Sequence, residues 1–108
     1  MIYELRIYTV LPGRMPALQT RFRDHTCRLF EKHGIKNVGY WTNVIGGRTD
    51  QLVYLVAFES LAARETAWAA FTADTEWRQI AASSEADGLI VHHIENRILA
   101  PTDFSPLG

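Results

Sequence analysis

His25 is the residue of this sequence whose type and position best suit proton-transfer chemistry. It lies in an uninterrupted run at 15–33, among Leu18, Phe22 and Leu29, which recur at helical spacing. At about 100° per residue His25 falls on this apolar stripe, so we expect its side chain to be at least half-buried and to face the sheet. Its ordinary pKa of about 6.5 makes an imidazole a suitable base near neutral pH. His25 is therefore either a catalytic base at a cavity wall or a core histidine bonded to the protein.

The other histidines suggest weaker chemistry. His33 immediately precedes Gly34, where an imidazolium complements the helix dipole and can bond the last carbonyls. His92 and His93 are adjacent in a predicted strand, so they point to opposite faces and one of them could approach His25. No carboxylate completes a facial triad and no spacing resembles a metal motif, so we expect no metal and no other cofactor. Haem ligation by His25 or His92 stays open as an alternative.

A second group of residues could bind a ligand. Aromatic residues make up 11% of the chain, and rings that do not simply fill the core could line a pocket for a hydrophobic or aromatic molecule. Tyr40 and Trp41 are adjacent in a strand, so we expect only one of them in any one pocket. The predicted ligand-binding residues are Tyr40, Trp41, Trp68, Trp77, His92, His93 and Arg6.

Two pairs of opposite charges alternate along predicted strands. Glu4 and Arg6 share one face of the first strand, and Glu95 and Arg97 share one face of the last. If these strands are antiparallel neighbours, Glu can lie against Arg across them as an ion pair. Binding of an anionic ligand by Arg6 is the alternative. Cys27 has no local basic partner that would activate it as a nucleophile.

Seven segments must position these side chains. β-Branched and aromatic residues bounded by Gly and Pro predict strands at 2–10, 35–45, 51–58 and 89–99. Helical spacing predicts a long helix at 15–33, a helix at 60–71 capped by Ser60, and a further helical segment capped by Asp74 or Thr75. The order βαββαβ predicts a ferredoxin-like α+β fold: a four-stranded antiparallel sheet in the order 4-1-3-2 with helices on one face.

The strand at 51–58 is apolar on both faces, although helices can cover only one. Its faces carry, respectively, Leu52, Tyr54, Val56 and Phe58, and Val53, Leu55 and Ala57. An open face this apolar exceeds the few hundred Å² that monomers tolerate. We therefore expect a homodimer in which two sheets close face to face into a barrel. We also expect the stiff tail at 101–108, anchored by Phe104, to cross to a groove such as one on the partner.

Composition limits the partners. With 108 residues the chain has room for one domain, at 1–100, followed by the tail at 101–108. A net charge of -1 gives no field to hold nucleic acid. No apolar run approaches the ~20 residues of a membrane span, and the single Cys27 fits a reducing compartment. We expect a cytoplasmic protein whose partners are itself and a small molecule, with no nucleic acid and no membrane span.

Six features occur in order along essentially the whole chain: Arg64 and the segments 3–9, 30–35, 39–41, 71–77 and 101–107. Together they resemble the pattern of the NIPSNAP family, within the dimeric α/β-barrel superfamily. The resemblance implies a ferredoxin-like subunit and a barrel dimer, but no settled enzymatic activity. Related barrel families include cofactor-independent monooxygenases, lactone isomerases and haem enzymes.

Three functions follow as hypotheses. The first is a homodimeric barrel that binds a small hydrophobic or aromatic molecule or serves as a non-catalytic scaffold. The second is a cofactor-independent monooxygenase or isomerase with His25 as its base, and the third is a haem-binding protein. Because His25, a strand-four histidine and Tyr40 or Trp41 all belong to the helix–sheet boundary, we expect any pocket between helix and sheet.

Overall fold

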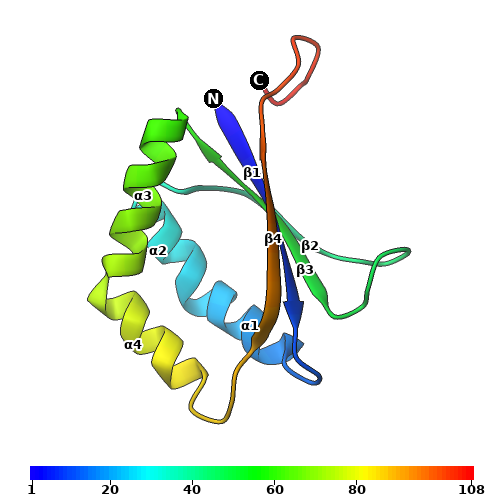
Figure 1. The fold of residues 1–108 in the computed structure, drawn as a ribbon, viewed down its shortest axis with the longest axis vertical. Coiled ribbons are helices and arrows are strands. Elements are labelled where there is room, and N and C mark those ends of the chain that lie inside the picture. The colour runs from blue at the N-terminus through cyan, green and yellow to red at the C-terminus, as the bar shows by residue number, and fades with distance from the viewer.

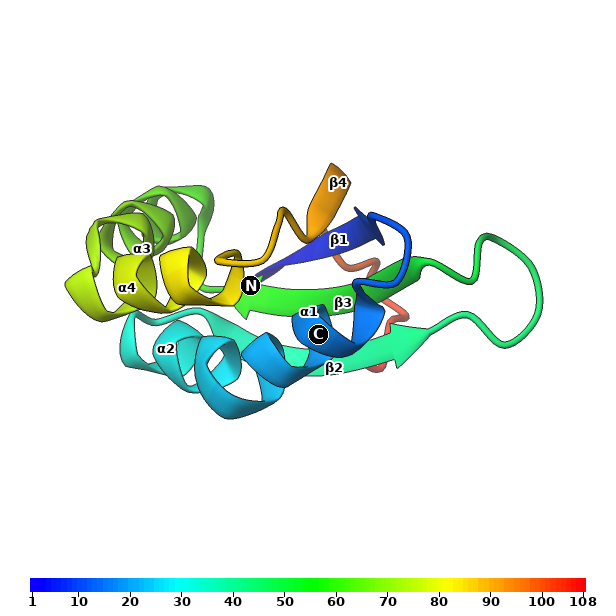
Figure 2. The same cartoon turned by 90° about the horizontal axis from the view of Figure 1, so that it is seen from below.

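The chain folds into two layers, a four-stranded antiparallel sheet and a set of helices on one face of it (Figures 1 and 2). The computed structural model describes residues 1–108. The elements are β1 (Ile2–Val10), α1 (Met15–Arg21), the π-helical turn η1 (Phe22–Thr26), α2 (Cys27–Lys32), β2 (Lys36–Thr42), β3 (Gln51–Phe58), α3 (Leu61–Ala73), α4 (Thr75–Ser84) and β4 (Val91–Leu99). The strand order β2-β3-β1-β4 confirms the ferredoxin-like prediction.

β2 is shorter than the sequence predicts. It ends at Thr42 rather than at residue 45, because the Asn43 side chain turns into the hairpin loop and donates from Nδ2 to the Arg48 carbonyl (2.8 Å). Val44 and Ile45 consequently lie in the loop, 94% and 93% exposed, instead of packing on the sheet.

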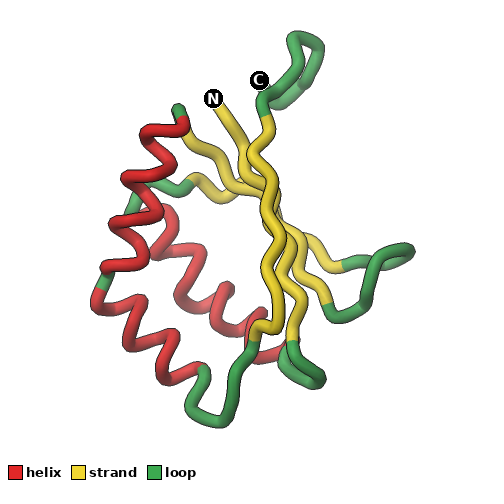
Figure 3. The backbone as a smooth tube through the Cα atoms, in the orientation of Figure 1, coloured by secondary structure: helices red, strands yellow, loops and turns green.

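The last strand also starts later than predicted. β4 begins at Val91 rather than at residue 89, because a shift in register opposite Val10 ends the regular pairing with β1. At its other end the chain leaves the sheet as an irregular segment that projects away from the helices (Figure 3). Phe104 in this tail is 83% exposed, so within one subunit it does not anchor the tail.

The structure confirms Ser60 as the cap of α3 and shows that, of the two alternatives Asp74 and Thr75, Asp74 caps α4. Ser60 Oγ accepts from the Ala63 N–H at the start of α3, and Asp74 Oδ1 accepts from the Trp77 N–H at the start of α4, each at 3.1 Å. Asp74 Oδ2 also contacts His33 Nε2 (2.6 Å), so the His33 side chain joins the end of α2 to the start of α4. Hydrogen bonds hold the pKa of the Asp74 carboxyl well below its usual range, and the bond with His33 has the largest effect.

α1, η1 and α2 form one continuous rod with a π turn in its middle (Figure 3). The Cys27 N–H donates to the Phe22 carbonyl, five residues back, so this wider turn holds an extra residue. The following side chains are rotated as a result, and Thr26, 2% exposed, takes the inward position. His25 instead lines a groove together with residues of α4. The prediction that His25 faces the sheet is therefore wrong, because it assumed an uninterrupted α-helical period.

The core fills the space between the helices and one sheet face. Leu52, Tyr54, Val56 and Phe58 of β3 lie in it, all at most 5% exposed. The pairing register puts Leu55 opposite Leu5 and Val53 opposite Ile7 on the other face, which no helix covers (Figure 1). We call this the open face. The two-sided apolar character predicted for the strand at 51–58 is therefore present.

Trp41 extends the open face across β2. A Cβ at Gly39 would lie 2.6 Å from Cη2 of the Trp41 ring, so the ring rests directly over this glycine. Trp41 is nevertheless 54% exposed, since nothing within the subunit covers its outer side. None of the helices is long and apolar enough to cross a membrane.

Candidate functional site

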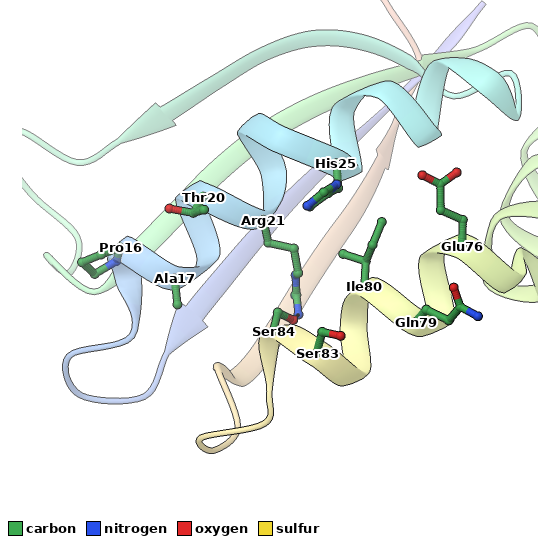
Figure 4. A pocket seen from close by; sticks show the side chains of 10 residues that line it. All are labelled: Pro16, Ala17, Thr20, Arg21, His25, Glu76, Gln79, Ile80, Ser83 and Ser84. Atoms are coloured by element: carbon green, nitrogen blue, oxygen red, sulfur yellow. Dashed lines mark hydrogen bonds between the residues drawn. The ribbon is translucent and has the colours of Figure 1, made fainter.

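A groove of about 650 Å³ runs between the rod and α4. Figure 4 shows Arg21 reaching from the rod to Ser84, with His25 beside it in the space between the two helices. We call this the helix groove. Its lining residues are Pro16, Ala17, Thr20, Arg21, His25, Glu76, Gln79, Ile80, Ser83 and Ser84.

Arg21 is the most buried charged group of the helix groove, with 8% of its surface exposed. Nη1 donates to Ser84 Oγ (3.2 Å), and Cζ lies 5.3 Å from the centre of the Trp77 ring. Nε is buried and has no hydrogen-bond partner. Burial lowers the pKa of Arg21, and the nearby Tyr8, Glu85 and Tyr54 oppose this effect only in part.

His25 lines the same groove and is partly exposed. Neither of its ring nitrogens takes part in any of the side-chain hydrogen bonds of the protein, in contrast to His33 on Asp74. A cavity bounded by His25 therefore exists, but between two helices and not between helix and sheet. Its role as a catalytic base stays a prediction.

A second cavity, of about 350 Å³, lies between η1 and β2. Its walls include the rings of Phe22, Tyr40 and Trp41, and we call it the aromatic pocket. The full lining is Gln19, Phe22, Arg23, Cys27, Tyr40, Trp41, Thr42 and Leu52. Both Tyr40 and Trp41 belong to it, so the prediction that only one could is wrong: β2 is an edge strand, and residues of both its faces reach a pocket at that edge.

Beneath the helices, a buried carboxylate gathers side chains from three elements. Glu4 of β1 is 0% exposed. Its oxygens accept from Arg64 Nε (2.8 Å) and Nη2 (3.2 Å) of α3, Trp68 Nε1 (2.9 Å) of α3, Asn96 Nδ2 (3.0 Å) of β4 and Arg6 Nη1 (2.9 Å) of β1. We call these five residues the Glu4 cluster.

The electrostatics of the Glu4 cluster keep its carboxylate ionised. Burial raises the pKa of Glu4, but the hydrogen bonds from Arg64, Asn96, Trp68 and Arg6 outweigh it and lower the pKa to about 2. Because its oxygens are saturated with donors, the carboxylate is poorly suited to accept a substrate proton. The Glu4 cluster is therefore an arrangement that joins sheet to helix.

The predicted ion pairs across β1 and β4 are wrong. The register sets Glu4 opposite Ile98 and Arg6 opposite Asn96, while Glu95 and Arg97 lie on the open face. The face of each side chain in β4 depends on a register that sequence spacing did not determine. Arg6 instead pairs with Glu4 along the same strand and donates from Nε to the Tyr54 hydroxyl (2.8 Å).

The remaining predicted ligand residues do not converge on one place. Trp68 is bound to Glu4, and Trp77 lies against Arg21. His92 and His93 are exposed on β4, where His93 pairs with Thr9 in the sheet. They line neither cavity. Nowhere do three His, Cys, Asp or Glu side chains come together as metal ligands.

Comparison with known proteins identifies the family from almost the entire chain. The NIPSNAP family model matches residues 3–106. The chain belongs to the NIPSNAP family. A NIPSNAP family protein of unknown function from Agrobacterium tumefaciens is 31% identical to it, with a TM-score of 0.86 over 100% of this chain and 94% of that one. The resemblance seen in the sequence is thus confirmed.

Two further comparisons limit how much of a known protein's function can be carried over to this NIPSNAP chain. Protein NipSnap homolog 3B of Mus musculus is 29% identical over 77 residues, which are 71% of this chain. They are 30% of the mouse protein, so the chain spans less than a third of that relative's length. A putative antibiotic biosynthesis monooxygenase from Nitrosomonas europaea has a TM-score of 0.64 at 12% identity, covering 94% of this chain and 98% of that one. This likeness shows a shared fold alone.

The burial of Arg21 in this NIPSNAP chain was not predicted from the sequence. Arg21 follows Leu18 by three residues and precedes Phe22, so it borders the apolar stripe of the rod. This position was an available signal that the stem of the arginine lies along apolar surface. The convergence of Arg64, Trp68 and Asn96 on Glu4 left no comparable signal, because these residues come from segments far apart in the sequence.

Proposed function

We propose that this NIPSNAP chain is a homodimeric protein that binds a small aromatic or hydrophobic molecule in the aromatic pocket. The observation that carries the proposal is the pocket lining, in which Phe22, Tyr40, Trp41 and Leu52 surround about 350 Å³. That volume lies in the range of small-molecule sites, and rings supply broad stacking surfaces.

The titratable groups of the pocket favour binding over catalysis. Its lining includes Cys27, Tyr40 and Arg23, but no carboxylate and no imidazole. Burial raises the pKa of the Cys27 thiol and raises that of the Tyr40 hydroxyl well above its usual range. At neutral pH the thiol is therefore protonated and a poor nucleophile, and the phenol is not a base.

The homodimeric part of the proposal rests on the open face. Leu5, Ile7, Val53 and Leu55 meet there on neighbouring strands and are only partly buried within one subunit. A second copy would remove this surface from water, with the two sheets forming a barrel. The exposed Phe104 would anchor the tail on the partner, and the one free cysteine, Cys27, is compatible with the cytoplasm.

Filling the aromatic pocket tests the proposal. We expect the neutral probe N-phenyl-1-naphthylamine to bind the protein with a rise in fluorescence. Thr42→Trp, placed in the pocket wall, should weaken that binding at least roughly tenfold, because its ring takes the probe's place. Thr49→Trp makes the same change in the exposed hairpin loop and serves as the control. Equal affinity of the two variants would contradict the proposed site.

The unbonded imidazole of His25 favours a second candidate function, a cofactor-independent oxygenase or isomerase acting in the helix groove. Oxygen uptake with a set of hydroquinones tests the oxygenase form. His25→Ala should abolish any uptake and leave the thermal midpoint nearly unchanged, since the side chain makes no hydrogen bond. His33→Ala, outside the groove, should retain uptake. Activity that survives His25→Ala would eliminate His25 as the base.

A further inference from the structure

Arg21 differs from the partly buried arginines Arg6 and Arg64 in having no carboxylate beside it. Arg6 and Arg64 both pair with Glu4, at 2.9 and 2.8 Å. Arg21 is more than nine-tenths buried, yet it forms no ion pair, and its Nε lacks any partner. A guanidinium withdrawn from water without a counter-ion destabilises a fold. An anion bound from outside the chain would compensate this charge.

The neighbouring side chains do not neutralise Arg21. The Ser84 hydroxyl donates to the Ala81 carbonyl (2.8 Å), and its oxygen is a neutral acceptor for Nη1. Glu76, at the far end of the helix groove, is paired with Arg28 at 2.7 Å. Glu85 acts on Arg21 only through its charge at a distance, because no ion pair joins the two. The positive charge of Arg21 thus lies uncompensated in the groove wall.

We infer that the helix groove binds a small organic anion, a carboxylate or a phosphate ester, whose oxygens pair with the Arg21 guanidinium. The planar guanidinium matches two oxygens of either group. His25, Ser83 and Gln79 line the same groove and supply further polar contacts, while Ala17 and Ile80 supply apolar wall for the body of the ligand. The site is separate from the aromatic pocket and does not depend on the function proposed for it.

Two probes distinguish the anion classes. The thermal midpoint is measured with sodium benzoate and with inorganic phosphate, at an ionic strength held constant with sodium chloride. We expect one or both to raise the midpoint of the wild-type protein by several degrees in a saturable manner. A response to benzoate alone assigns the site to carboxylates, and a response to phosphate alone assigns it to phosphates.

Variants of Arg21 test whether the rise in thermal midpoint comes from binding in the helix groove. Arg21→Met should abolish the shift, and without probe it should unfold at the same or a higher temperature than the wild type, because a buried uncompensated charge is removed. Arg78→Met removes an exposed charge from α4 outside the groove and should respond like the wild type. Arg21→Lys keeps the charge but not the planar fork, and should bind at least roughly tenfold more weakly, which serves if Arg21→Met does not fold.

Three results would overturn the inference. The first is a wild-type protein that responds to neither probe, and the second is an Arg21→Met variant that responds as strongly as the wild type. The third is equal affinity of Arg21→Lys and wild type for the active probe. Since Thr42→Trp acts on the aromatic pocket alone, loss of binding there and loss of binding at Arg21 are measured separately.

Discussion

Glu4 shows how one residue can fix the relation between sheet and helix. Its side chain is fully buried. It nevertheless stays charged, because it accepts hydrogen bonds from Arg64, Asn96, Trp68 and Arg6. Two of these donors come from α3 and one from β4, so the carboxylate ties both to β1. Removing such an acceptor leaves its cationic partners unpaired. The resulting loss of folding stability exceeds the net contribution of the hydrogen bonds themselves.

We predict that Glu4→Gln lowers the free energy of unfolding at pH 7 by about 3–5 kcal/mol, since Arg6 and Arg64 lose their counter-charge. Urea unfolding measures the change. Glu59→Gln is the matched control, because Glu59 lies exposed between β3 and α3 and forms no ion pair, so its loss should cost little. Equal losses for the two variants would contradict the structural role assigned to Glu4.

The pH dependence of stability provides an independent measure of Glu4. Its pKa falls from 4.5 to about 2 on folding, which corresponds to roughly 3 kcal/mol of stability. Because the folded value is depressed, this contribution is fully present above pH 4.5 and is lost as the pH falls toward 2. The wild type should therefore lose more stability over that interval than Glu4→Gln, and parallel pH profiles would rule out the assignment.

At the scale of elements, the contact between the end of α2 and the start of α4 depends on Asp74. One oxygen caps α4, and the other contacts Lys32 Nζ (3.0 Å) and His33 Nε2 (2.6 Å) at the end of α2. A cap and a tertiary contact thus share one side chain. The two roles can be separated, because an asparagine keeps the capping oxygen and loses the charge.

We predict that Asp74→Ala lowers the thermal midpoint by roughly 4–8 °C, as expected for loss of an N-cap in a domain of this size. Asp74→Asn should fall between Ala and wild type, since it retains the bond from the Trp77 N–H but not the ionic contacts with Lys32 and His33. Differential scanning calorimetry of the three proteins is the measurement. An Asn variant as unstable as Ala would show that the charge, and not the cap, is what matters.

At the scale of the whole molecule, the open face is the feature that a single chain leaves unexplained. Apolar residues on β1 and β3 lie side by side there, and Trp41 on β2 and Leu99 on β4 are 54% and 40% exposed. The helices all lie on the other face (Figure 1), so a cover for the open face would come from another molecule. A second copy of this chain presents the same apolar surface and is the simplest cover.

We predict that wild-type protein has twice the 12.3 kDa mass of one chain in light scattering, and that Leu55→Glu runs at 12.3 kDa. A carboxylate in the middle of a buried sheet interface has no partner there and opposes association. Leu61→Glu is the control, because Leu61 is 58% exposed at the start of α3, away from the open face. A wild-type protein of 12.3 kDa at all concentrations would contradict the dimer.

The sequence alone determined the fold because the signals for it are local. Period-two and helical patterns, Gly and Pro at the turns, and the caps Ser60 and Asp74 each act over a few residues, and together they predict βαββαβ. The two apolar faces of β3 followed from the same alternation, because side chains in a strand must point to opposite sides.

Tertiary structure decided the sites. The π turn in the rod moved His25 from the sheet to α4, a one-residue change in period that helical spacing does not reveal. The register of β4 placed Asn96 within hydrogen-bond distance of Glu4 and Arg97 on the open face. Arg21 lacks a counter-ion because no carboxylate of α4 forms an ion pair with it. Each depends on contacts between distant segments, whose energies of a few kcal/mol are set only when the elements pack together.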